Sequence, residues 1–295
     1  MSERTNPYMP SGREIVKLGK DRIVKNKGRL NRRILIGVPT LGLIRIEWDV
    51  HRRGQTIPIN WQVGEITANH MPPSVFSEGY HTADAQNVII ERVVLDNYEW
   101  CLLWEDDVLP PFDALFKMNL HMERMTAPMV SGLYYSKGEP TWPLTFRGRG
   151  NGAYRDWAMG DQLWLDGVPT GFLLIHGDVL KWFWANSEEY KLPDGRRCRR
   201  VFEFQRKSWY DPEADRYFAQ MGTSDLYFCD RIRKEKVFEK VYPKGHPFRK
   251  FGRMRYPFLC DTTIFSQQVD HSGKYYPAGC TEVLPPMRKT KQKAG

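Results

Sequence analysis

The sequence predicts an α/β domain built around a mostly parallel sheet, and two observations carry this prediction. The chain has 295 residues, of which 41% are hydrophobic and 27% are charged, and this composition is typical of a globular protein. From residue 33 to about residue 130, short apolar runs typical of buried strands alternate with segments of helical periodicity. That alternation indicates βαβ units, in which ligands bind beyond the carboxyl ends of the strands.

The expected elements follow from these periodicities in chain order. The β-branched run at 33–38 ends at Pro39, a helical pattern ends at Gly54, and Thr82 or Asp84 is a plausible helix cap. In the first half we expect strands at 33–38, 56–63 and 100–104 and helices at 43–53, 84–95 and 112–125. In the second half we expect strands at 129–136, 168–176, 236–242 and 259–271, helices at 178–186 and 224–234, and a long irregular loop at 137–165. The second half is thus more mixed than the first.

Composition also bears on the location of the protein. No apolar run approaches the roughly 20 residues that span a bilayer, so no transmembrane segment is expected. The first twenty residues contain no apolar stretch typical of a signal peptide. Five widely spaced cysteines with no CxxC pattern argue against a disulfide framework or a zinc site. We therefore expect a cytoplasmic protein, the cytoplasm of a virus-infected host cell included.

Positive charge gathers at both ends of the chain. The formal net charge is +9, but residues 1–33 hold ten Lys or Arg against three acids, and the last eight residues hold four Lys or Arg. The stretch between them carries a small net negative charge. Basic ends attract polyanions such as nucleic acid or anionic lipid, or they form solvated tails that only aid solubility. A further arginine cluster with aromatic neighbours at 196–210 suits either phosphates and stacked rings or an exposed hairpin.

The acidic triplet Glu105-Asp106-Asp107 is the strongest local signal. It follows the apolar run Trp100–Trp104 and precedes Val108, Leu109 and two prolines. Carboxylates packed this closely raise one another's pKa values, so a structure tolerates them where a cation sits among them or where water surrounds them. Hard divalent cations take carboxylate oxygens and commonly bridge to phosphates. The triplet is therefore either a metal site or a solvated acidic turn.

Two later residues extend this pattern. Asp225 lies in the first turn of an expected helix, where an acid also stabilises the helix dipole. His271 ends an expected strand in the sequence VDHSG. A lone histidine is more often structural, but histidine is a good further ligand for Mn²⁺ where carboxylates supply the others.

Taken in order, these segments resemble the GT-A class of nucleotide-sugar-dependent glycosyltransferases, and specifically its family-2-like group. The resembling segments are IGVPT (36–40), ADAQN (83–87), LLWEDDVLPP (102–111), PTGFLLI (169–175), SDLYFCDRIR (224–233) and VDHSG (269–273). The resemblance implies a GT-A, Rossmann-like, mostly parallel central sheet flanked by helices, with a mixed region on the acceptor side. It also implies metal-dependent transfer of a hexosyl or pentosyl group from a nucleotide sugar to an acceptor hydroxyl.

The resemblance assigns roles to individual residues. The triplet matches the family's DxD position, with Glu105 in place of the first aspartate, and Asp225 matches the acid that serves as base in inverting members. Ser224 stands where glutamate is common, and Gln86 stands where the family has arginine. The implied ligands of Mn²⁺ (or Mg²⁺) are Asp107, His271 and Glu105. The implied contacts to the nucleotide sugar, which is UDP- or GDP-linked, are Pro39, Thr40, Gln86, Asn87, Glu105 and Asp106.

The acceptor side is less defined by the sequence. We expect a basic extension at 1–32, a glycosyltransferase domain at 33–285 and a basic tail at 286–295. The domain divides into a nucleotide-sugar-binding half at 33–130 and an acceptor-binding half at 131–285. The acceptors that the basic ends permit include DNA with hydroxylated bases, a lipid-linked acceptor and a protein. The candidate acceptor-binding residues are Trp142, Arg147, Arg197 and Trp209.

Two other functions remain open at this point. A nucleotidyltransferase shares the nucleotide-binding sheet and metal-binding acids, but it usually has a Gly-rich basic loop after the first strand, and here that loop has one glycine and no adjacent lysine. A non-catalytic nucleic-acid- or carbohydrate-binding protein would suit the ten tryptophans and the basic ends. Neither a Walker A nor a GxGxxG sequence is present.

Overall fold

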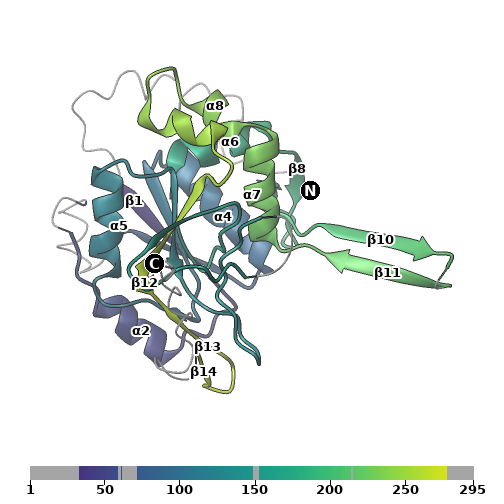
Figure 1. Cartoon of the computed structure of the whole chain (residues 1–295), viewed down its shortest axis with the longest axis horizontal. Coiled ribbons are helices and arrows are strands. Elements are labelled where there is room, and N and C mark those ends of the chain that lie inside the picture. The colour runs from purple at the N-terminus through teal and green to yellow at the C-terminus, as the bar shows by residue number, and fades with distance from the viewer. Residues whose placement is uncertain (1–32, 59–60, 62–71, 149–152, 214, 278–295) are drawn as a thin grey trace, which may run out of the picture.

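The computed structural model describes residues 33–58, 61, 72–148, 153–213 and 215–277 (Figure 1). The expected basic extension and basic tail lie outside these described residues. The main sheet comprises β1 (Ile34–Thr40), β2 (Ser74–Glu78), β3 (Trp100–Trp104), β5 (Met129–Leu133), β6 (Gln162–Leu165), β7 (Phe172–His176) and β12 (Phe258–Phe265). The helices are α2 (Ile46–Arg53), α4 (Thr82–Leu95), α5 (Ala114–Glu123), α6 (Gly177–Asn186), α7 (Ser224–Lys234), α8 (Val237–Val241) and the 3-10 helix η1 (Pro247–Arg253).

The main sheet has the strand order β2-β1-β3-β7-β5-β12-β6. Strands β2, β1 and β3 are parallel, and β5 and β12 run in the same direction as they do. Strands β7 and β6 run the opposite way, because each pairs antiparallel with its neighbours. The predicted fold class is confirmed: the chain has an α/β fold with a mostly parallel central sheet flanked by helices, consistent with a Rossmann-like GT-A fold.

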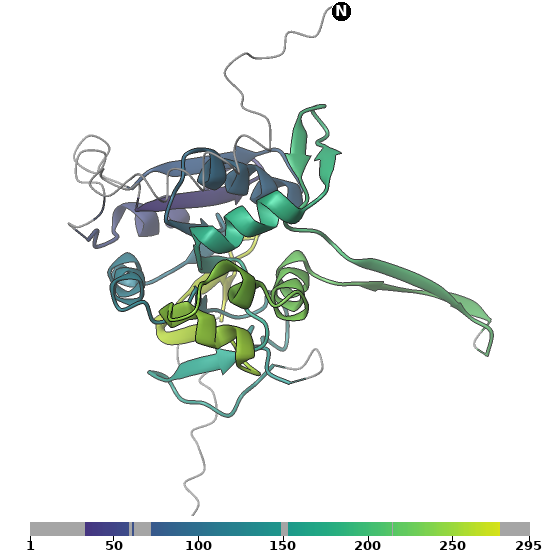
Figure 2. The same ribbon diagram turned by 90° about the horizontal axis from the view of Figure 1, so that it is seen from above.

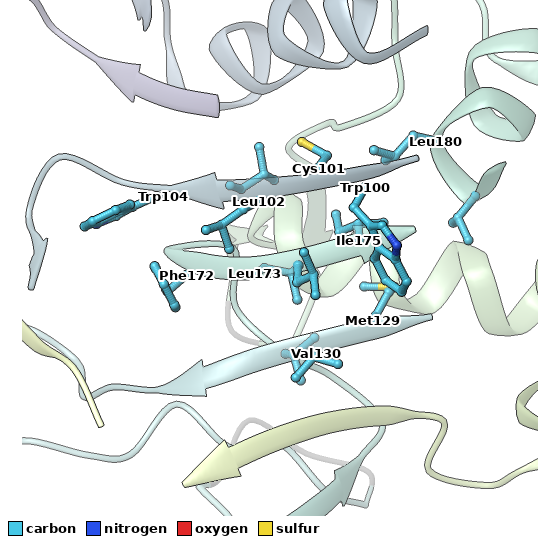
Figure 3. Packing of buried hydrophobic residues seen from close by; sticks show 14 of the residues in the cluster. Trp100, Cys101, Leu102, Trp104, Met129, Val130, Phe172, Leu173, Ile175 and Leu180 are labelled. Carbon is cyan, nitrogen blue, oxygen red and sulfur yellow. The ribbon is translucent and has the colours of Figure 1, made fainter. Parts of the chain in front are cut away.

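Apolar side chains of β3, β5 and β7 pack together in the core, with Trp104 and Phe172 toward one end of these strands (Figure 3). The Trp104 ring lies edge-on to Phe172 at 5.4 Å between ring centroids and packs against Trp48 at 5.2 Å. Its indole N–H donates to the carbonyl of Val108 at 2.8 Å, so the ring is tied to the chain that follows β3. The last core residue of β3 thereby holds the acidic triplet that comes directly after it.

Two of the predicted strands differ from the structure. Of the predicted strand at 56–63, the described residues 56–58 and 61 form no strand and the others lie outside the described residues, while the strand that pairs with β1 is β2, at Ser74–Glu78. The segment 236–242, with its Val and Phe residues, forms helix α8 instead. Lys236 takes a left-handed backbone with φ of 52°, which ends α7 and turns the chain into α8. Val237 and Phe238 then become buried, and the Phe238 ring contacts Phe258 at the start of β12.

Three small sheets accompany the main one. One joins β4 (Val108–Leu109), β13 (Gln267–Val269) and β14 (Tyr275–Tyr276), and another pairs β8 (Glu189–Lys191) with β9 (Arg197–Arg199). Strands β10 (Arg206–Asp211) and β11 (Arg216–Met221) form a long hairpin that projects from the body in both views (Figures 1 and 2). Among the described residues, no helix combines the length and the apolar character needed to cross a membrane.

His176, the last residue of β7, is buried among aromatic rings. Its ring lies 4.8 Å from that of Trp100 and 5.4 Å from that of Phe248, and its Nδ1 is 3.1 Å from the hydroxyl of Tyr242. Burial lowers the pKa of His176 to about 4, although the carboxylate of Asp178 opposes this shift. The imidazole is therefore neutral in the folded protein at neutral pH.

We expect the folded state to lose stability as the pH falls, because His176 binds a proton more readily when the chain unfolds. Its pKa is lower in the folded state, so its contribution is complete above about pH 6.5 and is lost as the pH falls toward 4. Between pH 7 and pH 5 the loss is about 2 kcal/mol in the free energy of unfolding. Urea unfolding at the two pH values measures it, and the His176→Gln variant should show a smaller pH dependence by this amount. An unchanged pH dependence in the variant would contradict the assignment.

Candidate active site

The acidic triplet lies where three parallel strands end. Glu105, Asp106 and Asp107 directly follow β3, and β1 ends beside them at Thr40. The backbone N–H of Glu105 donates to Gly171 at 2.9 Å. The indole N–H of Trp48 donates to the Glu105 carbonyl at 3.0 Å. The backbone N–H of Val269 donates to the Asp107 carbonyl at 2.9 Å. The backbone of the triplet is thus held from three sides of the fold.

Helix α7 brings a further carboxylate, that of Asp225, to this point. The pKa of Glu105 is raised to about 8, first by burial and then by the charges of Asp107 and Asp225, while Lys137 and Thr170 oppose the shift. Burial also raises the pKa of Asp225, although a hydroxyl hydrogen bond from Thr223 and the N–H of Leu226, at 2.7 Å, oppose this. Three carboxyl groups therefore share one poorly solvated region, which favours any cation that enters it.

Asp107 differs from the other acids in its partners. Its Oδ2 accepts a hydrogen bond from the ammonium group of Lys137, whereas its Oδ1 is buried without a hydrogen-bond partner in the described structure. A buried carboxylate oxygen without a partner is costly, and a bound cation is one group that satisfies it. This observation fits a metal ligand at Asp107. Lys137 lies in the connection between β5 and β6, and the predicted loop at 137–165 is wrong at its end, because Gln162–Leu165 form β6 by pairing with β12. The residue type of Lys137 alone indicated no role for it.

Asp106 points toward β1. The Thr40 hydroxyl forms a hydrogen bond with Asp106, which lowers the pKa of that carboxyl, although burial raises it on balance. The Thr40 Oγ1 also accepts from the N–H of Gly42 at 3.1 Å. Pro39 and Thr40 are buried at the end of β1, beside the triplet, and their contact with a nucleotide stays a prediction.

A chain of hydrogen-bonded polar side chains joins α7, the helix that carries Asp225, to the residue that follows β3. Ser224 Oγ donates to Gln86 at 3.2 Å, Gln86 Nε2 donates to Thr170 at 2.9 Å, and the Thr170 hydroxyl donates to Glu105 Oε1 at 3.3 Å. The Gln86 side chain is fully buried, so it holds α4, α7 and the triplet together. Thr170 lies in PTGFLLI (169–175), one of the segments that resemble the glycosyltransferase family, but its residue type alone indicated no role for it.

Asn87, which the resemblance implies as a contact to the nucleotide sugar, is bonded to protein groups in this structure. Its side chain is also fully buried, and its Oδ1 accepts from the backbone N–H groups of Val201 and Phe202 at 3.1 and 2.7 Å. Its Nδ2 donates to the Phe202 carbonyl and to the Tyr190 hydroxyl. With its amide engaged by protein groups, Asn87 fixes the segment around residues 201 and 202 rather than facing a ligand. The Gln86 amide is likewise engaged by Thr170 and Ser224, and contact of either residue with a nucleotide stays a prediction.

The backbone just before His271 lies beside that of Asp107, but the His271 side chain does not belong to a cluster of metal-binding side chains there. It is an exposed residue two positions after β13, whose Val269 bonds to Asp107, and its carbonyl accepts from Arg45 at 3.5 Å. Among the described residues, no group of three or more His, Cys, Asp or Glu side chains is arranged to hold a metal ion. The predicted set of Asp107, His271 and Glu105 is therefore not assembled in this structure, and metal binding stays a prediction.

The four acceptor candidates lie in different places. Trp142 is part of the loop that brings Lys137 to Asp107, and the Arg155 guanidinium lies 3.8 Å from its ring centroid. Arg147 stacks on Tyr256 at 4.5 Å, just before the amino end of β12, and so lies away from the triplet. Arg197 is in β9 and pairs with Glu189 at 3.1 Å. Trp209 is in β10, and its side chain is outside the described part of the structure.

A pocket of about 640 Å³ opens at the start of α4, two residues from Gln86. It is lined on one side by His81, Ala83 and Asp84, and on the other by the β8–β9 region and residues 200–204, with Tyr190 and Phe204 among them. The Tyr190 hydroxyl donates to Asp84 at 2.5 Å, and the Arg200 guanidinium lies over the Tyr190 ring at 4.7 Å. The first turn of α4 thus has the pocket on one side and the polar chain to Glu105 on the other.

The known structures that resemble this chain do so distantly. No protein-family model matches the chain, and no curated protein matches it. Among solved structures, the chain is similar to A197 from STIV, with 13% identity and a TM-score of 0.46 over 82% of this chain and 92% of that one. It is also similar to S. aureus TarS (residues 1–349) in complex with UDP, with 12% identity and a TM-score of 0.32 over 50% of this chain and 48% of that one. For TarS with UDP-GlcNAc the values are 12%, 0.33, 50% and 46%.

The chain spans about half the length of the TarS structures. All three TM-scores are below 0.5, and no family is shown by these likenesses. The fold class rests on the strand order and directions of the main sheet.

Proposed function

We propose that this chain is a glycosyltransferase that moves a sugar from a nucleotide sugar to an acceptor hydroxyl. The observation that carries the proposal is the electrostatic coupling of Glu105, half-buried, to the half-buried carboxylates of Asp107 and Asp225, beyond the carboxyl ends of the strands. Ligands of such sheets bind at this edge. A carboxylate from a separate helix, facing two acids at a strand end, supplies both a base and a cation-attracting region.

In the proposed reaction Asp225 accepts the proton of the acceptor hydroxyl as its oxygen bonds to the anomeric carbon of the donor. The bond from that carbon to the diphosphate breaks, and the nucleoside diphosphate leaves. Burial raises the pKa of Asp225, which makes it a stronger base than an exposed aspartate. Pro39, Thr40 and Asp106 border the nucleotide of a UDP- or GDP-linked donor.

Asp107, together with Glu105 and His271, would hold Mn²⁺ or Mg²⁺. The bound ion would neutralise the charge of the leaving diphosphate. Lys137 donates to Asp107 here, so Asp107 would hold an ion only if this ammonium moved aside or shared the carboxylate with it. The pocket beside α4 offers a carboxylate and a phenol next to apolar and aromatic side chains, which suits the hydroxyl-bearing part of an acceptor.

Isothermal titration of UDP- and GDP-sugars, with and without Mn²⁺, tests the proposal. We expect one donor class to bind with an affinity that Mn²⁺ increases, and we expect slow donor hydrolysis that releases the nucleoside diphosphate. Release of pyrophosphate from a nucleoside triphosphate would indicate a nucleotidyltransferase instead. Binding of neither donor class, with or without the metal, would contradict the proposal and leave a non-catalytic binding protein. Acceptors are then screened among hydroxymethylated DNA, lipid-linked sugars and glycosylated proteins.

A further inference from the structure

The folded body carries a strongly basic region that the charge of the chain as a whole conceals. Residues 231–255 hold ten Lys or Arg against two Glu, a net charge of +8. The rest of the chain between its two basic ends, residues 34–230 and 256–287, holds 20 Lys or Arg against 30 Asp or Glu. Positive charge is thus concentrated in one tenth of the chain, which forms the end of α7, α8, η1 and the approach to β12.

Eight of these cations are exposed, and we call their side chains the basic surface. They are Arg233, Lys234, Lys236, Lys240, Lys244, Lys250, Arg253 and Arg255. Only the first two have a carboxylate partner among the described residues: Arg233 lies 3.8 Å from Asp166, and Lys234 lies 2.6 Å from Asp230. The other six form no ion pair there, so their charge is available to a ligand.

The basic surface stands on a platform that is fixed to the core. Phe248 packs edge-on to Trp100 at 5.9 Å, and Phe251 stacks on Trp164 at 5.2 Å between ring centroids. Arg249 donates to the carbonyls of Glu239 and Tyr242, which joins η1 to α8. The spacing of the cations is therefore set by the fold.

The surface lies at the opposite end of the sheet from the proposed active site. Phe248 contacts Trp100 at the amino end of β3, whereas Glu105 follows its carboxyl end. Figure 1 shows α8 at one end of the molecule and β13 and β14 at the other. Helix α7 starts at the site, with Asp225, and ends at the surface, with Lys234. The cations are therefore separate from the donor phosphates of the proposed reaction.

We propose that the basic surface binds the phosphodiester backbone of a nucleic acid without sequence preference. Several exposed Lys and Arg side chains without a carboxylate partner, carried by neighbouring elements that are fixed to the core, suit a polymer with regularly spaced phosphates, which binds by releasing counterions. Lys240, Lys250 and Arg255 lie over aromatic rings, which leaves their charge without a counterion. A membrane surface is less suited, because helices that bind membranes also insert apolar side chains. Phe238, Phe248 and Phe251 are buried, and Met254, 37% exposed, is the one exposed large apolar side chain of 231–255. The proposal does not depend on the glycosyltransferase assignment.

Fluorescence anisotropy with a labelled random-sequence DNA duplex, over a series of salt concentrations, tests this proposal on the full chain. The test variant combines Lys250→Gln, Arg253→Gln and Arg255→Gln. The control combines Arg53→Gln, Arg92→Gln and Arg124→Gln, which removes the same charge from α2, α4 and the end of α5. If all three phosphate contacts are lost, the slope of log K against log[salt] should become less steep by up to about 2.7, with affinity at least roughly tenfold weaker.

The control should keep the slope of the unchanged protein, and so should Asp225→Asn, which addresses the proposed active site alone. An equal loss in the test and control triples would show that overall charge is responsible and would overturn the proposal. An unchanged slope in the test triple would overturn it as well. If the test triple instead weakened binding to vesicles containing phosphatidylglycerol and left DNA binding intact, the surface would be a membrane surface. Circular dichroism of both triples checks that they are folded.

Discussion

The Asp225→Asn variant is expected to transfer sugar about 10²-fold more slowly, or slower still, while it binds the donor as the unchanged protein does. An amide cannot take the proton of an acceptor hydroxyl, but it has nearly the shape of the carboxyl group. It can still accept the hydrogen bond that the Leu226 N–H donates to Oδ1 at 2.7 Å. The start of α7 should therefore keep its structure, and only the chemical step should suffer. Single-turnover rates measure the loss, and calorimetry measures donor affinity.

Asp230→Asn provides the matched control for this experiment. Asp230 lies on the same helix and pairs with Lys234 at 2.6 Å, outside the proposed active site. Its substitution removes the same charge from α7 and should leave the rate of transfer unchanged. If both variants were slowed equally, the effect would come from the charge of the helix, and Asp225 would not be the base.

The Asp107→Ala variant is expected to lose detectable transfer and the part of donor affinity that Mn²⁺ provides. Asp107 is the acid whose Oδ1 is buried without a partner, so it is the acid best placed to gain from a cation. Donor affinity measured with and without Mn²⁺ tests the expectation, and full activity of Asp107→Ala with Mn²⁺ would contradict it.

Lys137→Met separates two explanations for such a loss. Replacing Asp107 removes a carboxylate and also leaves the Lys137 ammonium without its partner. Lys137→Met breaks the same ion pair but keeps the carboxylate, so donor binding should stay dependent on Mn²⁺. If this variant lost the metal dependence as completely as Asp107→Ala does, the ion pair itself, and not a metal ligand at Asp107, would be the essential feature.

Elements with strong and continuous patterns could be predicted from the sequence. Strand Trp100–Trp104 and helix Ser224–Lys234 have the predicted bounds, because an unbroken apolar run and a clear helical period leave few alternatives. Strand Ser74–Glu78 was missed because only its Val and Phe are apolar, and it is ordered by its parallel pairing with β1. Helix α8 was misassigned because Val and Phe at 237–241 have the composition of a strand, whereas packing on Phe258 decides the outcome.

The candidate site shows the same limit. The acidic triplet and Asp225 stood out because their residue types are chemically distinctive at the ends of expected elements. Lys137, Thr170 and Tyr190 are common residue types, and what singles them out is spatial contact with residues thirty or more positions away. Charge averaged over the whole middle of the chain also concealed the basic surface, since acids elsewhere in the chain cancelled it.

Among the described residues, the acidic triplet and the basic surface lie at opposite ends of the sheet, so this part of the protein has a charge asymmetry along α7. Long-range fields orient a dipolar molecule before it makes contact. Near a polyanion this protein would rotate so that its cationic end leads, and the mouth of the carboxylate-lined site would face open solution. A small anionic donor could then reach that mouth by diffusion while the polymer occupies the far end.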